Sequence, residues 1–232
     1  ANIKLTVQTG PTISIGSLSG SSFTSCSGAA GAERSFSVTG SSLTGDLTVT
    51  PPTGYEVSTT SGSGFNSSSI TLAESGGSVS TTVYARLTSS ASDGASGNIA
   101  ISGGGATTKN VATGTGVVSH SAYYVDDAGS NSNAGNSSGA PFATIAYAIS
   151  KVGACASTTI NVLAGSYSEK GITIADGTSN LSIVGAGIAS TIFTGDNTDR
   201  FIHMANSGNS DASSNSNNIT ISNMKISGYE ST

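Results

Sequence analysis

Pairs of apolar residues recur through the second half of the chain at intervals of about 20 residues. One set comprises Ile160/Val162, Leu181/Ile183, Phe201/Ile202 and Ile219/Ile221, and the set between them comprises Ile172/Ile174, Ile192/Phe193 and Met224/Ile226. A repeat of this length with several short strands is typical of a β-solenoid, in which each coil buries its inward side chains by stacking on the next. The period therefore predicts a coiled stack of parallel strands.

The first half shows a different period, because apolar and polar residues alternate in short runs. Such runs predict strands with one buried face, and their apolar members are Phe36/Val38, Leu47/Val49, Tyr55/Val57, Ile70/Leu72, Val83/Ala85/Leu87, Ile99/Ile101 and Val111. Residues 51–54, Pro-Pro-Thr-Gly, predict a turn between two of them. Ile3–Val7 and Ile13–Leu18 are expected to be earlier strands. Seven short strands with Gly, Ser and Pro between them favour a β-sandwich.

One segment between the two halves has helical spacing. Phe142, Ile145, Ala146, Ile149 and Val152 lie on one face of a helix. Gly153 follows at the position expected for its C-terminal stop. The fold class is therefore all-β with one short helix over residues 142–152.

Charge excludes two classes of partner. Only 9% of the residues are charged, the net charge is −5, and the eight Lys and Arg residues are scattered singly. No basic cluster is present to neutralise phosphates, so the sequence predicts no nucleic-acid partner. No apolar run approaches the roughly 18 residues that a membrane span requires, so no membrane insertion is expected.

The first half resembles the immunoglobulin-like repeats of large secreted Bacteroidetes surface proteins. The resemblance is carried by Ser35–Gly40, Leu43–Asp46, Pro52–Ser58, Val83–Leu87 and Ser96–Ile99. It implies a spacer or stalk without chemistry of its own, in proteins that often use type IX secretion. The C-terminal sorting domain of that export route is not in this sequence.

The second half resembles the N-terminal part of pectin-lyase-like, right-handed parallel β-helix proteins. The motifs are Tyr124–Asp126, Gly129–Asn133, Pro141–Ile145, Ile160–Tyr167, Leu181–Gly187 and Asn218–Asn223. The resemblance implies that the helix caps the first coil. It says little of activity, since this fold serves lyases, hydrolases and adhesins alike.

Together these observations predict four segments. They are a possible tail of a preceding element (1–11), an Ig-like β-sandwich (12–116), a junction (117–122), and a cap with the first coils of a β-helix (123–232). Because the chain stops at a coil that looks mid-solenoid, the β-helix is expected to be truncated and further domains of the same chain to follow.

Few residues suggest chemistry. Asp126, Asp127 and Asn131 offer oxygen ligands for calcium, with polar turn closure as the alternative. Asp196, Asn197, Asp199 and Arg200 form a second polar group, for which a solvated turn is the alternative. Asn161, Asn218 and Asn223 are expected at inward turn positions, where stacked amides bond between coils. Glu169 and Lys170 are expected to be solvated.

The two cysteines, Cys26 and Cys155, would pair in an oxidising compartment, and two separate buried thiols are the alternative. Their spacing fits no zinc motif.

Two functions remain open. In the first, the chain belongs to an extracellular or cell-surface adhesin-type structural protein, with a polysaccharide or cell-surface glycan as partner. In the second, it is the front of a secreted polysaccharide lyase or glycoside hydrolase whose catalytic coils are missing. No catalytic residue set is evident, so enzyme status stays open. A fragment of a type IX secretion cargo is compatible with either.

Overall fold

The computed structural model describes residues 10–20, 22–204 and 218–230. This part of the chain contains nineteen strands and one five-residue helix, which confirms the all-β class. It divides into two compact units, Ala1–Val118 and Ser119–Thr232, which we call the N-terminal and C-terminal units. The boundary falls within the predicted junction. The predicted strand Ile3–Val7, in the segment 1–11, lies outside the described residues.

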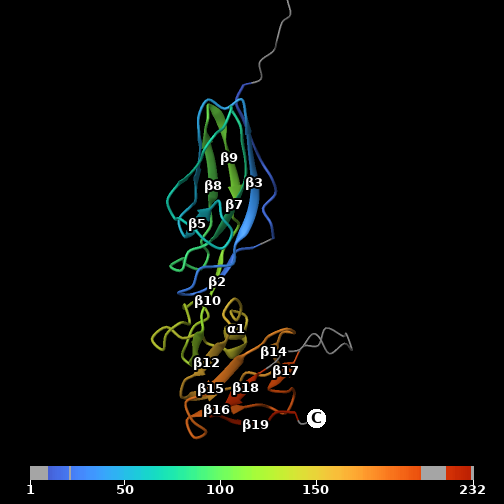
Figure 1. The fold of residues 1–232 in the computed structure, drawn as a ribbon. Coiled ribbons are helices and arrows are strands. Elements are labelled where there is room, and N and C mark those ends of the chain that lie inside the picture. The colour runs from blue at the N-terminus through green and yellow to red at the C-terminus, as the bar shows by residue number, and fades with distance from the viewer. Residues whose placement is uncertain (1–9, 21, 205–217, 231–232) are drawn as a thin grey trace, which may run out of the picture. The chain divides into compact units, whose positions relative to one another are not determined.

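The N-terminal unit contains two four-stranded antiparallel sheets. The first has the order β1 (Thr12–Ile15), β3 (Arg34–Ser41), β7 (Val79–Leu87), β5 (Tyr55–Ser58). The second has the order β6 (Ile70–Leu72), β4 (Leu47–Thr50), β8 (Asn98–Gly103), β9 (Ala106–Ala112). Two short strands that alternation did not predict, β2 (Thr24–Cys26) and β10 (Val117–Ser119), form a separate pair. In Figure 1 the long strands of this unit run side by side along its length.

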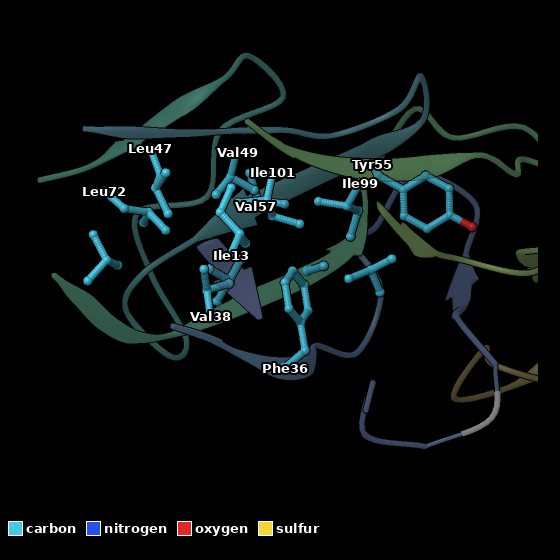
Figure 2. Close-up of a cluster of buried hydrophobic side chains, with 14 of the residues drawn as sticks. Ile13, Phe36, Val38, Leu47, Val49, Tyr55, Val57, Leu72, Ile99 and Ile101 are labelled. Carbon is cyan, nitrogen blue, oxygen red and sulfur yellow. The ribbon is translucent and has the colours of Figure 1, made fainter. Parts of the chain in front are cut away.

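Both sheets contribute to one hydrophobic core, as Figure 2 shows. Leu47 and Val49 are fully buried while Thr48 and Thr50 between and after them are not, which is the predicted period of two. Each fully buried side chain of this size contributes about 1.5–3 kcal/mol relative to exposure. The predicted turn at 51–54 is confirmed: Tyr55 N–H donates to Pro52 O at 3.1 Å, and Gly54 has a φ of 85°.

The C-terminal unit is built from three parallel sheets, which the chain visits in turn. Their orders are β11 (Ala122–Val125), β12 (Thr158–Val162), β15 (Leu181–Gly185), β18 (Thr220–Ser222); then β13 (Gly165–Tyr167), β16 (Thr191–Thr194), β19 (Lys225–Ser227); and β14 (Ile172–Ile174), β17 (Ile202–Met204). Equivalent strands of successive coils are therefore hydrogen-bonded neighbours. The yellow-to-red strands of Figure 1 show this stacking.

The register corrects the predicted grouping of apolar pairs. Ile183 pairs with Ile160 on one side and with Ile221 on the other, whereas Ile202 pairs with Ile172 in another sheet. The interval of about 20 residues thus joins strands from different sheets, and the second coil is longer than the first. The periodicity misled because turns between coils vary in length, so equal sequence spacing does not mean equal position.

The helix α1 (Ile145–Ile149) is shorter than the predicted span of 142–152. Thr144 is extended, with φ −139° and ψ 144°, and its side chain accepts a hydrogen bond from Tyr147 N as the N-cap. Phe142 instead forms a parallel β-bridge with Val125. The helix ends at Ser150 rather than at Gly153, and Ala148 takes the buried place predicted for Ala146.

No helix within the described ranges has the length and apolar character needed to cross a membrane.

Candidate functional site

The densest group of interacting charges lies on the turns that join the second and third sheets of the C-terminal unit. We call it the turn cluster: Lys170, Asp196, Thr198, Asp199 and His203. Lys170 follows β13, and the other members lie between β16 and the middle of β17. Because β16 pairs in parallel with β13 and β17 with β14, the turns of successive coils lie next to one another.

Lys170 and Asp196 form an ion pair across the two coils. Lys170 Nζ lies 2.7 Å from Asp196 Oδ2 and also donates to the Thr198 hydroxyl. Asp196 Oδ1 accepts from the backbone amide of Thr198 at 3.1 Å. The hydrogen bond from Lys170, followed by those from Thr198, holds the pKa of Asp196 well below its usual range. Both charges therefore remain paired over a wide range of pH.

His203 and Asp199 form the second pair of the turn cluster. The distance from His203 Nε2 to Asp199 Oδ1 is 2.9 Å, and both side chains are about 40% exposed. The hydrogen bond from His203, followed by that from the Arg200 amide, lowers the pKa of Asp199. A carboxylate that holds one imidazole nitrogen orients the ring, so that the other nitrogen is available for proton transfer.

The predicted group of Asp196, Asn197, Asp199 and Arg200 is thus only partly the one that interacts. Asn197 occupies a turn position with a φ of 58°, and Arg200 contributes its backbone amide. The sequence prediction missed Lys170 and His203 as partners. Lys170 lies 26 residues before Asp196, which is about one coil, so the coil length would have linked them.

Glu169 is not simply solvated, as had been expected. Its two carboxylate oxygens accept hydrogen bonds from the first helical amides, Ile145 N at 2.7 Å and Ala146 N at 3.1 Å. Its carbonyl oxygen accepts from the Tyr229 hydroxyl at 2.7 Å. Burial raises the pKa of Glu169, while the two amides act in the opposite direction. Glu169 therefore fastens the helix to the turn between β13 and β14.

The three candidate calcium ligands each have a separate backbone partner. Asp126 Oδ1 accepts from Ala128 N at 2.8 Å, Asp127 Oδ2 accepts from Ser166 N at 2.9 Å, and Asn131 Oδ1 accepts from Ala143 N at 2.9 Å. No group of three His, Cys, Asp or Glu side chains in the described part of the chain is arranged to hold a metal ion. Turn closure accounts for each contact, and calcium binding stays a prediction.

Cys26 and Cys155 are both disulfide-bonded, and the structure contains no free thiol among its described residues. The alternative of two reduced cysteines is therefore wrong. That the two cysteines of one chain pair with each other stays a prediction.

The predicted asparagine contacts between coils are present, but at different positions. Asn218 Nδ2 donates to Asn180 Oδ1 at 3.0 Å, and Asn180 Nδ2 donates to Ala156 O at 3.0 Å. Asn161 faces away from the core, because its neighbours Ile160 and Val162 point inward, and it donates to Tyr123 O at 3.3 Å. Asn223 is exposed with a φ of 56°. Inward orientation was therefore wrong for Asn161, although its contact does join two strands.

The outward face of the sheet β11–β12–β15–β18 carries rows of uncharged side chains. The parallel register aligns Ala122, Thr159, Ser182 and Thr220 in one row, and Tyr124, Asn161, Val184 and Ser222 in the next. Neighbouring members of a row are separated by the strand spacing of about 4.8 Å. The face offers hydroxyl and amide groups and one aromatic ring, without an ionisable acid or base.

Comparison with known proteins adds no relative: no family model matches the chain, and neither a curated protein nor a solved structure does.

Proposed function

We propose that the chain is part of an extracellular, adhesin-type surface protein, in which an immunoglobulin-like β-sandwich carries a right-handed parallel β-helix. Two antiparallel sheets around one core support the first module. Three parallel sheets visited in turn, with inward side chains stacked in register, support the second. The disulfide-bonded state of both cysteines supports an oxidising compartment outside the cytoplasm.

The observation that carries the proposal is the pair of uncharged rows on β11–β12–β15–β18. Hydroxyl and amide groups at the regular spacing of a sheet suit repeated weak contacts with an extended polymer such as a glycan. Such a face holds a partner but supplies no acid or base to transform it. It therefore favours binding and support over catalysis.

A secreted polysaccharide lyase or glycoside hydrolase is the second candidate, and the Asp199–His203 pair is the observation in its favour. An imidazole oriented by a carboxylate can accept a proton from a sugar carbon or from water. Lys170, at one coil's distance, brings a positive charge near the same turns. Against this candidate stands the pairing of that charge with Asp196.

One experiment separates the two candidates. The purified 232-residue protein is incubated with acidic and neutral polysaccharides, and the release of unsaturated uronides and of reducing ends is measured. Retention on immobilised polysaccharide or on whole cells without product is the expected result. Product formation that disappears in the His203→Ala variant would establish the enzyme and overturn the adhesin-type proposal.

A further inference from the structure

A hollow of about 600 Å³ opens in the N-terminal unit between two of its loops. Its walls come from the β4–β5 turn, residues 51–54, and from the β7–β8 loop, residues 88–96, with Ser67 from the β5–β6 loop. This volume lies within the range of about 300–1,000 Å³ that small-molecule sites occupy. We call it the serine hollow, because Ser67, Ser90, Ser92 and Ser96 line it.

The lining combines apolar surface with hydroxyl groups and carries no charge. Pro52, Ala91 and Ala95 supply carbon surface, and the two alanines also pack against the core of the unit. Ser67, Ser92 and Ser96 are exposed, and within the described part of the chain their hydroxyls have no hydrogen-bond partner. These hydroxyls can therefore both donate to a ligand and accept from it.

The loop that forms the hollow is held in place by backbone contacts. Ala95 O accepts from the Tyr55 hydroxyl at 2.9 Å and from Gly116 N at 2.8 Å. Ala95 N donates to Ser92 O at 3.1 Å, which closes a turn within the loop. A wall that is ordered before binding loses little conformational entropy when a ligand enters.

Charge decides which class of ligand fits. Anionic ligands are held by Lys, Arg or His side chains, and cationic ligands by carboxylates, and the lining contains neither. Asp93, on the same loop, does not line the hollow and accepts from Val118 N at 2.9 Å. A neutral ligand with many hydroxyls and an apolar C–H face matches the mixture of serine hydroxyls and alanine and proline surface.

We propose that the serine hollow binds the sugar units of a neutral polysaccharide. This inference rests on the proposed adhesin-type function and deepens it, because it names a ligand class and a site in the N-terminal unit. Binding is expected to be weak for a single site, since the lining offers hydroxyls without a charge-assisted hydrogen bond. Repetition along a polymer would strengthen it through effective concentration.

The test uses the whole chain labelled with ¹⁵N and titrated with neutral cello-, manno- and xylo-oligosaccharides, and separately with an oligogalacturonate. The expected result is chemical-shift changes concentrated at residues 53–54 and 88–96 with at least one neutral probe. Ser92→Trp, which fills the hollow, is expected to weaken that binding at least tenfold. Ser89→Trp is the matched control, because Ser89 is exposed on the same loop but does not line the hollow.

Three results would overturn the inference. They are the absence of shifts with every neutral probe, binding by the oligogalacturonate alone, and unchanged affinity in a Ser92→Trp variant whose spectrum shows a folded protein. None of these results produces or removes a sugar product, so the product assay judges the adhesin-type proposal independently. Shifts confined to the outward face of β11–β12–β15–β18 would likewise remove the hollow while leaving the adhesin-type function intact.

Discussion

The carboxylate of Glu169 accepts a hydrogen bond of 2.7 Å from the backbone amide of Ile145, 24 residues earlier in the chain. The first amides of a helix have no partner within the helix and need one from outside it. Here a side chain from the turn after β13 supplies that partner, so the capping helix and the coil are joined at their polar ends as well as through the core.

Replacing Glu169 by Ala is expected to destabilise the C-terminal unit by about 1–2 kcal/mol, because two helical amides lose their acceptor. Hydrogen exchange at Ile145 and Ala146 provides the local measurement, and both amides should exchange faster in the variant. Amides of the N-terminal unit serve as the control. Unchanged exchange at both positions would mean that the helix is held by its apolar side chains alone.

The pKa of Glu169 makes this contact sensitive to pH. Because burial raises it above the ordinary value of 4.5, Glu169 favours folding most fully below that value, and the contribution is lost as pH rises through the folded-state pKa. Glu169→Gln, which cannot ionise, is the comparison. Relative to this variant, the wild-type free energy of unfolding should fall as the pH is raised from acid to neutral. A constant difference across that range would contradict the raised pKa.

The Asn180–Asn218 contact predicts a backbone effect as well as a side-chain effect. Asn180 has a φ of 53°, a conformation that costs an ordinary L-residue about 1–2 kcal/mol. Asn180→Gly and Asn180→Ala both lose the hydrogen bonds to Ala156 and Asn218, but only Ala adds the conformational cost. Chemical denaturation followed at resonances of the C-terminal unit should therefore rank Gly above Ala in stability. The reverse order would show that the turn relaxes to negative φ.

Tyr167 and Phe193 stack in register inside the coils, with ring centroids 4.6 Å apart and an interplanar angle of 15°. Phe193 is fully buried, so Phe193→Ala is expected to cost about 3–5 kcal/mol through lost contacts and the cavity left behind. Phe193→Leu keeps more of the volume and should cost less. Denaturation of both variants measures the difference, and equal losses would indicate that the site collapses around the smaller side chain.

The cysteines give a direct chemical prediction. Protein denatured without reductant should not react with a maleimide, whereas reduction should expose two reactive thiols per chain, because both cysteines are disulfide-bonded. The mass of the unreduced protein tests the pairing of Cys26 with Cys155. A monomer mass supports pairing within one chain, and a covalent dimer would contradict it.

The sequence alone determined the class of the fold and most of its strands. Alternation is a local property: Leu47 and Val49 face inward because neighbouring strand residues point to opposite faces, whatever the partner strand is. The turn at 51–54 and the asparagines between coils were predictable for the same reason, since the backbone preferences of Pro, Gly and Asn do not depend on distant residues.

The tertiary structure decided which strands are neighbours and therefore which polar groups meet. Ile183 pairs with Ile221 rather than with Phe201 or Ile202, because the register between coils is set by the stacking of inward side chains across turns of unequal length. The same stacking brings Lys170 to Asp196 and Glu169 to the helix. These contacts join residues a coil apart, so no local pattern encodes them, and the fold class could be predicted while the arrangement of the charged side chains could not.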